Sequence, residues 1–320
     1  MGNKDAVLYA LSQEDEPVSG EVLAAQLGVS RAAIWKAVNA LREEGYAIDA
    51  QSNRGYVLRN GIGVLTESGL RKELQRPDRK IELLDEVDST NTRAKALAAQ
   101  GAPEGTLVIA DCQREGRGRF GRRFHSPKGS GLYMSLVLRP RLPAEQAVRV
   151  TVIAAVAAAQ AVEDMAGGSV EIKWVNDLFA GGKKLCGILT EAGMDFESGQ
   201  LEYCVVGIGI NVNKEAYPQE IAEIATSIQE QWGMPVSRCQ LAAKIVNRIE
   251  EMMEEPMNEK IMEEYRRRSN VLGRLVTVSR GDQRFDALAM RIDDDGGLVV
   301  RTEDGDTTLR SGEVSLKVKP

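Results

Sequence analysis

Residues 113–124 read QREGRGRFGRRF and gather five arginines and three glycines within one short stretch. Unpaired guanidiniums are rarely buried and glycine lowers the cost of positive φ, so this stretch predicts a loop rather than a core helix or strand. Arginine forks match carboxylate and phosphate oxygens, and N–H groups beside glycines add partial positive charge. The stretch therefore predicts a loop that binds an anion; a disordered RNA-binding segment and a solvated turn share its composition.

Strand-like runs flank this loop, from Thr106 to Ala110 before it and from Leu132 to Leu138 after it. Upstream, Asp88-Ser89-Thr90-Asn91 supplies capping residues for a helix from Thr92 to Ala99. Downstream, the alanine-rich run from Val148 to Met165 predicts a long helix that can pack closely against a sheet. The loop is therefore expected to join two strands of an α/β domain.

Two further polar clusters follow strand-like runs. Lys173-Trp174-Val175-Asn176-Asp177 comes after a short strand, and Gly181-Gly182-Lys183-Lys184 leads onto an apolar strand. A turn explains the first cluster and a solvated hairpin tip explains the second, so neither by itself indicates catalysis. Gly207-Ile208-Gly209-Ile210-Asn211 predicts a strand whose glycines let a ligand or another strand approach the backbone closely.

The composition is that of a globular chain of 320 residues, 43% hydrophobic and 28% charged, which is enough for two or three domains. Neither a basic-then-apolar leader nor an apolar run of membrane length is visible, so a cytoplasmic location without membrane contact is expected. The four cysteines lack Cys-x-x-Cys spacing and are expected to be small buried hydrophobes. A single histidine, His125, excludes two-histidine metal sites, and the net charge of −6 means that nucleic-acid contact would require a local basic face.

Residues 1–62 predict a winged-helix DNA-binding domain made of three helices and a hairpin. Ser30 can cap the third helix, in which Ile34, Val38 and Leu41 form an apolar face. The residues expected to contact DNA are Ser30, Arg31, Trp35, Lys36, Asn39, Arg42 and Arg54. A small helical domain with solvated charges is the alternative, because the first sixty residues hold eight acidic and six basic side chains. One such domain rarely binds specifically alone, so a dimer on a two-fold DNA site is expected.

The sequence pattern indicates two further domain boundaries. A short glycine-containing segment at 61–66 predicts a linker, and a central α/β domain is expected at 66–270. A C-terminal domain is expected at 271–320, where runs at 276–278, 285–291, 298–302 and 314–318 alternate with Asp- and Gly-rich turns. These runs predict a small antiparallel barrel, so the fold class is α/β (α+β) with several domains.

Five motifs carry a resemblance to a known family. They are Ser89-Thr90-Asn91, Gln113 with Gly116-Arg117-Gly118-Arg119, Lys173-Trp174-x-Asn176-Asp177, Lys184-Leu185-x-Gly187-Ile188-Leu189 and Gly207-x-Gly209-x-Asn211. In this order and spacing the chain resembles the biotin-protein ligases and, with the winged helix in front, the class that is both ligase and biotin-responsive repressor. The resemblance implies a central mixed-sheet domain of the biotin/lipoate ligase type and an SH3-like C-terminal domain.

The activity implied by the resemblance has two steps. Biotin and ATP give biotinyl-5′-adenylate and pyrophosphate, and the biotinyl group then passes to one lysine of the biotin carboxyl carrier protein of a carboxylase such as acetyl-CoA carboxylase. Mg²⁺ is the implied metal, operator DNA is a further partner, and the adenylate is the implied corepressor that promotes a homodimer. A biotin sensor without catalysis and a lipoate or octanoate ligase are the alternatives.

The resemblance also implies site residues. For biotin they are Ser89, Thr90, Asn91, Gln113, Arg117, Gly118, Arg119, Tyr133, Lys184, Gly187 and Gly207. For the nucleotide they are Arg119, Arg122, Phe124, Asn176, Lys184, Asn211 and Lys317, the last of which is also consistent with a solvated terminal lysine. The residues assigned to catalysis are Lys184, Arg117, Arg119 and Asp177. The three cations are expected to cancel the repulsion between carboxylate and α-phosphate, and Asp177 to position or deprotonate the acceptor lysine.

The arginine-glycine loop is expected to act as a lid that is disordered without ligand and excludes water once closed. Asn176 and Asp177 are expected to help the phosphates hold Mg²⁺. The sequence departs from the family pattern at Phe124, where the family often carries Trp, and at Val175, where it often carries Pro. His125 is expected to be a bystander.

Overall fold

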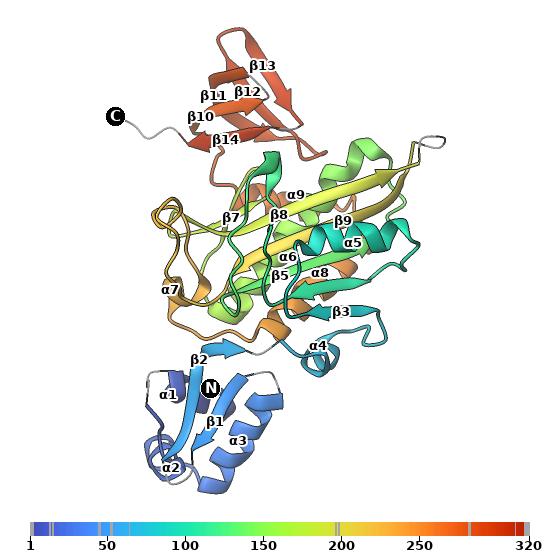
Figure 1. The fold of residues 1–320 in the computed structure, drawn as a ribbon. Helices are drawn as coiled ribbons and strands as arrows, with labels where there is room; N and C mark the ends of the chain where they lie inside the picture. Colours follow the sequence, from blue (N-terminus) through green and yellow to red (C-terminus); the bar gives the residue numbers. More distant parts are fainter. Residues whose placement is uncertain are drawn as a thin grey trace.

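The computed structural model describes residues 3–12, 14, 16–43, 46–51, 54–63, 65–195, 197, 199–280, 283–310 and 312–316. Figure 1 shows three regions in chain order, with N-terminal helices and a hairpin at one end, a large sheet with its helices in the middle, and a small group of strands at the other end. The predicted combination of a helical N-terminal unit, a mixed sheet and a C-terminal β unit is therefore confirmed.

The N-terminal unit has the predicted order of elements. They are α1 (Asn3–Ser12), α2 (Gly20–Leu27), α3 (Arg31–Glu43), β1 (Tyr46–Gln51) and β2 (Gly55–Gly63). The Ser30 hydroxyl accepts a hydrogen bond from the Ala33 amide at 3.2 Å and so caps α3. Ile34, Val38 and Leu41 are fully buried against the other helices, and β1 pairs antiparallel with β2. This unit has a hydrophobic core of its own.

The central sheet is mixed. Its strands are β3 (Ile81–Leu84), β4 (Leu107–Ala110), β5 (Gly131–Leu138), β6 (Glu171–Lys173), β7 (Asp177–Ala180), β8 (Lys183–Met194) and β9 (Leu201–Asn211). They lie in the order β3-β4-β5-β9-β8-β7-β6, and only β3 and β4 pair in parallel. The arginine-glycine loop joins the neighbouring strands β4 and β5, as predicted.

Helices cover the two faces of this sheet differently. The helices of the region are α4 (Glu67–Glu73), α5 (Thr90–Ala99), α6 (Ala147–Ala166), α7 (Ile228–Trp232), α8 (Arg238–Glu254) and α9 (Glu259–Arg268), with 3-10 turns at Arg119–Gly121 and Ala144–Gln146. The alanines of α6 let it pack closely on one face together with α8, whereas α5 packs on the opposite face. In the described part of the chain, none of the helices has the length and apolar character needed to cross a membrane.

The C-terminal strands form one antiparallel sheet. They are β10 (Leu275–Arg280), β11 (Gln283–Ile292), β12 (Leu298–Thr302), β13 (Gly305–Leu309) and β14 (Glu313–Leu316), in the order β13-β12-β11-β10-β14. The sequence missed β13 because its first four residues, Gly305 to Thr308, are polar and exposed. Val276 and Val314 belong to the same buried cluster as the central sheet, and the Trp174 indole N–H donates to the Gly296 carbonyl at 2.9 Å. The C-terminal strands therefore pack directly on the central domain.

One expectation about the cysteines was wrong in part. Cys186, Cys204 and Cys239 are buried, but Cys112 is only partly buried because it lies beyond the end of β4, where the arginine-glycine loop begins. All four are free thiols. Burial raises the pKa of the Cys186 thiol, since the charged thiolate is poorly solvated there.

Candidate functional site

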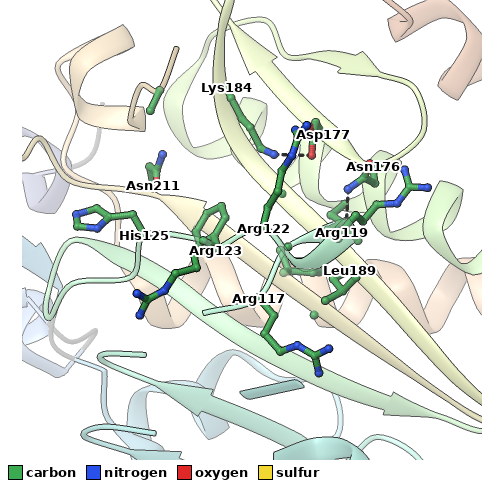
Figure 2. Close-up of a pocket in the computed structure, with 18 of the residues that line it drawn as sticks. Arg117, Arg119, Arg122, Arg123, His125, Asn176, Asp177, Lys184, Leu189 and Asn211 are labelled. Carbon is green, nitrogen blue, oxygen red and sulfur yellow. Dashed lines mark hydrogen bonds and ion pairs between the residues drawn. The ribbon is translucent and has the colours of Figure 1, made fainter. Parts of the chain in front are cut away.

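A cavity of about 460 Å³ opens on the face of the sheet that carries α5. Fifteen of the predicted site residues line it: Ser89, Thr90, Asn91, Gln113, Arg117, Gly118, Arg119, Arg122, Phe124, Asn176, Asp177, Lys184, Gly187, Gly207 and Asn211. They come from segments far apart in the sequence, and Figure 2 shows several of them around the opening. Tyr133 is not among the lining residues, and Lys317 lies outside the described residues.

Polar groups with fixed orientations occupy one end of the cavity. The Gln113 Oε1 atom accepts from the Thr90 amide at 2.9 Å and lies 3.1 Å from its hydroxyl, while Nε2 donates to the Ser126 hydroxyl at 2.9 Å. Ser89 accepts from the Thr92 amide at 3.4 Å and caps α5, which confirms the capping interpretation. These hydrogen bonds hold the hydroxyls and the amide in place before any ligand arrives.

Asn91 is held from two sides, partly by residues that the sequence analysis missed. Its Nδ2 donates to the Leu189 carbonyl at 3.1 Å and to the Glu191 carboxylate at 3.0 Å, and its Oδ1 accepts from the buried Ser135 hydroxyl at 2.7 Å. Glu191 lies two residues beyond the Gly187–Leu189 motif, and Ser135 lies two residues beyond Tyr133. Both therefore share the cavity face of their strands, and the period of two could have identified them.

The strand glycines make room for side chains of the cavity. A Cβ on Gly207 would lie 2.1 Å from Asn91 Oδ1, and one on Gly209 would lie 2.6 Å from a Phe124 ring carbon. Gly207 was expected to leave room for the ligand, but the group beside it here is the Asn91 amide. Phe124 lies over Gly209 and meets the Tyr133 ring edge-on, with 6.4 Å between ring centroids.

Tyr133 lies behind this layer, and the expectation that it contacts biotin is not supported. The side chain is 1% exposed, and its hydroxyl lies 2.9 Å from the Ser130 hydroxyl and donates to the Pro127 carbonyl at 3.1 Å. Burial raises the pKa of this phenol, which therefore stays neutral. The Tyr133 ring therefore packs against Phe124 on the side of the sheet.

Cations gather at the other end of the cavity. Lys184 Nζ lies 2.8 Å from Asp177 Oδ1, and Arg119 Nη1 donates to Asn176 Oδ1 at 3.2 Å, as Figure 2 shows. The Asn176 Nδ2 donates to the Ile188 carbonyl at 2.7 Å, which fixes the amide. Asn176 and Asp177 each face a cation in this structure, so their expected part in holding Mg²⁺ stays a prediction. Among the described residues, groups of three or more His, Cys, Asp or Glu suited to a metal ion are also absent.

The arginine-glycine loop is internally bonded. The Gly118 amide donates to the Arg122 carbonyl at 2.7 Å, and the Phe124 amide donates to the Gly116 carbonyl at 2.8 Å. Of the three glycines in the loop, Gly121 alone has a positive φ, at 74°. Gly116 is required for space instead, since a Cβ there would lie 2.4 Å from the Phe124 carbonyl oxygen.

Arg117 of the loop and the adjacent His125 each face an acidic side chain. Arg117 points away from Lys184 and Asp177 in Figure 2, and its Nη1 lies 3.7 Å from Glu191 Oε1. His125 lines the cavity rim, with Nε2 3.2 Å from a Glu215 oxygen. The predicted disorder of the ligand-free loop stays a prediction.

A segment without any sequence motif also borders the cavity. Residues 221 and 223–225 line it. The Lys184 amide donates to the Ile224 carbonyl at 2.7 Å, and the Thr226 amide donates to the Lys184 carbonyl at 2.9 Å. The Asn211 Nδ2 donates to the Thr226 carbonyl at 3.0 Å and fastens the same segment. Asn211 therefore has a structural partner in addition to its place at the cavity.

The polar face of α3 is available for contact. Trp35 is 58% exposed, and Arg31 and Lys36 are exposed beside it. Arg42 Nε donates to the Ile48 carbonyl at 2.8 Å, so part of this side chain is engaged in holding the hairpin to the helix. Asn39 is partly buried on the same helix. At the hairpin tip, Arg54 pairs with a carboxylate of the helical unit, that of Glu16, at 3.1 Å.

Comparisons with known proteins agree with this architecture. The model of the biotin/lipoate A/B protein ligase family matches residues 83–211, an HTH domain model matches 3–57, and the model of the biotin protein ligase C-terminal domain matches 271–317. The bifunctional ligase/repressor BirA of Bacillus subtilis is 36% identical over 98% of both chains, and that of Escherichia coli is 28% identical over 97% of this chain and 96% of its own.

The fold comparison points the same way. A biotin protein ligase from Aquifex aeolicus, solved in complex with biotin and ATP, matches with a TM-score of 0.64 and 29% identity over 75% of this chain and 99% of its own. Identity along nearly the whole of the Bacillus subtilis protein includes the helical N-terminal unit as well as the cavity domain. The chain therefore belongs to the family of bifunctional biotin ligase/repressors.

Proposed function

We propose that this chain activates biotin with ATP to biotinyl-5′-adenylate, transfers biotin to one lysine of a biotin carboxyl carrier protein, and represses biotin genes when liganded. The observation that carries the proposal is the cavity itself, where separate segments bring amides and hydroxyls to one end and cations to the other. The Aquifex aeolicus relative, with its bound biotin and ATP, supports the same pair of substrates.

The polar end suits the ureido ring of biotin. That ring presents two N–H donors and one carbonyl acceptor in a compact apolar frame, so it needs a few oriented polar groups in an otherwise apolar slot. Thr90, Asn91 and Gln113 supply such groups, and their orientations are set by bonds to each other and to Ser135. Phe124 covers the slot with an apolar ring.

The cationic end suits the meeting of two anions. A carboxylate oxygen of biotin attacks the α-phosphorus of ATP, the bond from that phosphorus to the bridging oxygen breaks, and pyrophosphate leaves. Lys184, Arg119 and Arg117 offset the negative charge that accumulates during this displacement. Mg²⁺ would accompany the ATP phosphates, where Asn176 and Asp177 are the protein groups proposed to help hold it.

Transfer to the carrier protein requires a neutral amine. The acceptor lysine loses a proton, its nitrogen attacks the acyl carbon, and AMP leaves with the bonding electron pair. Asp177 is the carboxylate that we assign to orient the acceptor lysine and take up its proton, and it would exchange its present partner Lys184 for the incoming ammonium group.

Regulation would use the N-terminal unit. We infer domains at 1–62, 66–270 and 271–320. In the first, α3 would present Trp35 and Lys36 to the major groove, and the hairpin tip would present Arg54 to the backbone beside it. The adenylate would order the arginine-glycine loop and favour a homodimer on the operator. A cytoplasmic location forms part of this proposal.

Incubation with biotin, ATP, Mg²⁺ and a carrier domain tests the enzyme directly. Biotinylated carrier detected by mass spectrometry is the expected result. Folded protein that binds biotin without forming the adenylate would leave only the sensor. Preferential use of lipoate in a competition assay would instead assign the other acyl substrate.

A further inference from the structure

Glu191 holds a partly buried carboxylate beside the cavity and has three partners. Lys95 Nζ lies 2.7 Å from Oε1, Asn91 Nδ2 donates to Oε2 at 3.0 Å, and Arg117 Nη1 lies 3.7 Å from Oε1. The side chain is 19% exposed. Burial opposes ionisation, but the hydrogen bonds from Lys95 and Asn91 and the charge of Arg117 outweigh it and lower the pKa of Glu191. The carboxylate is therefore charged in this structure.

The three partners are not held equally. Lys95 and Asn91 together occupy both carboxylate oxygens at hydrogen-bond distance, whereas Arg117 is farther away and its side chain is 50% exposed. An exposed ion pair of this length contributes little. Arg117 can therefore move away while Glu191 keeps two partners, so the partly buried Glu191 carboxylate is not left unpaired.

The proposed chemistry requires Arg117 to move away from Glu191. Its guanidinium points away from the Lys184–Asp177 pair in Figure 2, whereas neutralising a substrate carboxylate requires it to face the cavity. We propose that Glu191 is the resident counter-ion of Arg117, a positioning residue that holds the guanidinium at the cavity edge until a substrate carboxylate replaces it. Ligand binding then exchanges one carboxylate partner for another. This inference rests on the proposed function, because it needs an anionic substrate beside Arg117.

The exchange makes Glu191 a competitor of the substrate carboxylate. Glu191→Gln keeps the length of the side chain and an oxygen that can accept from Asn91, but removes the charge that holds Arg117. Biotin should then bind about two- to fivefold more tightly, which is the range expected for an exposed ion pair. Biotinol, in which a hydroxymethyl group replaces the carboxylate, should bind with unchanged affinity.

Isothermal titration of biotin and biotinol into wild type, Glu191→Gln, Arg117→Met and the double variant tests the exchange. Biotin affinity should rise in Glu191→Gln, and this gain should disappear in the double variant, because the competition acts only through Arg117. A gain that persists in the double variant would assign the effect to the unpaired Lys95 charge and overturn the proposal. Equal affinities of wild type and Glu191→Gln for biotin, or a parallel change for biotinol, would also overturn it.

Lys95→Met provides a second variant if Glu191→Gln fails to fold. Loss of Lys95 leaves Arg117 as the remaining cation beside Glu191, so biotin should bind about two- to fivefold more weakly, and only while Arg117 is present. Unchanged biotin affinity in Lys95→Met would contradict the exchange. A wild type that binds neither biotin nor biotinol would instead refute the proposed function, and the exchange with it.

Discussion

Replacement of Lys184 by methionine should remove most of the adenylation activity while the fold persists. Methionine retains an unbranched apolar stem, and the Lys184 side chain is 34% exposed, so little packing is lost. The change removes an ammonium group that lies 2.8 Å from Asp177 at the cationic end of the cavity. It also leaves the Asp177 carboxylate without that partner, so the site becomes more negative just where two anions must meet.

Both effects act in the same direction on the transition state. Loss of one preorganised charge-stabilising group typically slows a reaction by about 10²–10³-fold, or about 3–4 kcal/mol. Partial solvent exposure places Lys184 toward the lower end of that range, because water screens part of the charge. Single-turnover formation of biotinyl-5′-adenylate, followed by chromatography with saturating ATP, measures the effect without interference from product release.

Lys183→Met is the matched control. Lys183 is the preceding residue on β8, carries the same side chain, and does not line the cavity; its Nζ lies 3.5 Å from the Ala222 carbonyl. Adenylation by Lys183→Met should stay within about twofold of wild type, and operator binding by the ligand-free protein should be little changed in either variant. Equal adenylation rates for the two variants would refute the assignment of Lys184 to charge stabilisation.

Three other outcomes are expected. Gly209→Ala should weaken biotin binding at least tenfold with the sheet intact, since the new Cβ would lie 2.6 Å from a Phe124 ring carbon and must displace the ring; titration calorimetry checks this. Trp35→Ala should reduce operator affinity in a gel-shift assay with unchanged adenylation, because its exposed ring belongs to α3 and lies outside the cavity. Hydrogen bonding from Arg267 lowers the pKa of Glu264 from its ordinary 4.5 to about 2, so the stability that Glu264 contributes should be present above pH 4.5 and be lost as the pH falls toward 2. Urea unfolding at pH 7 and pH 3 should therefore show a smaller pH dependence for Glu264→Gln than for wild type.

Local chemistry explains which parts of the site could be predicted from the sequence. Ser89 caps a helix because serine oxygens accept from the first helical amides, and this fixed the position of the neighbouring Thr90 as well. Lys184 follows a glycine turn onto a strand, as its neighbours predict, whereas its place in the cavity was implied only by the family resemblance. The helix cap and the turn depend on a few adjacent residues, so the sequence carries enough information to predict them.

Contacts between distant strands were beyond this kind of inference. Tyr133 faces the cavity side of β5, but the Phe124 ring packs against it, and Tyr133 pairs with Gly209 through a strand register that the sequence does not show. Residues 221–225 approach Lys184 through backbone hydrogen bonds, which any side chains can make, so no motif marks them. β13 was missed for a related reason, since an exposed edge strand has no need of alternating apolar residues.

Strand register also explains why glycines are concentrated on this face of the sheet. Tyr133 on β5 pairs with Gly209 on β9, and Gly209 pairs with Gly187 on β8, so one row across three strands holds a single large side chain followed by two glycines. The Phe124 ring occupies the space that these glycines leave, with ring carbons 2.6 Å and 3.4 Å from the Cβ positions of Gly209 and Gly187. A loop residue thus completes a packing layer of the sheet. Opening of the loop would withdraw this ring and leave the two glycines uncovered, so the depth of the apolar slot depends on the loop. The same loop holds Arg117 and Arg119, which we propose to neutralise the anions, so coverage of the slot by Phe124 and neutralisation of the charge would be coupled.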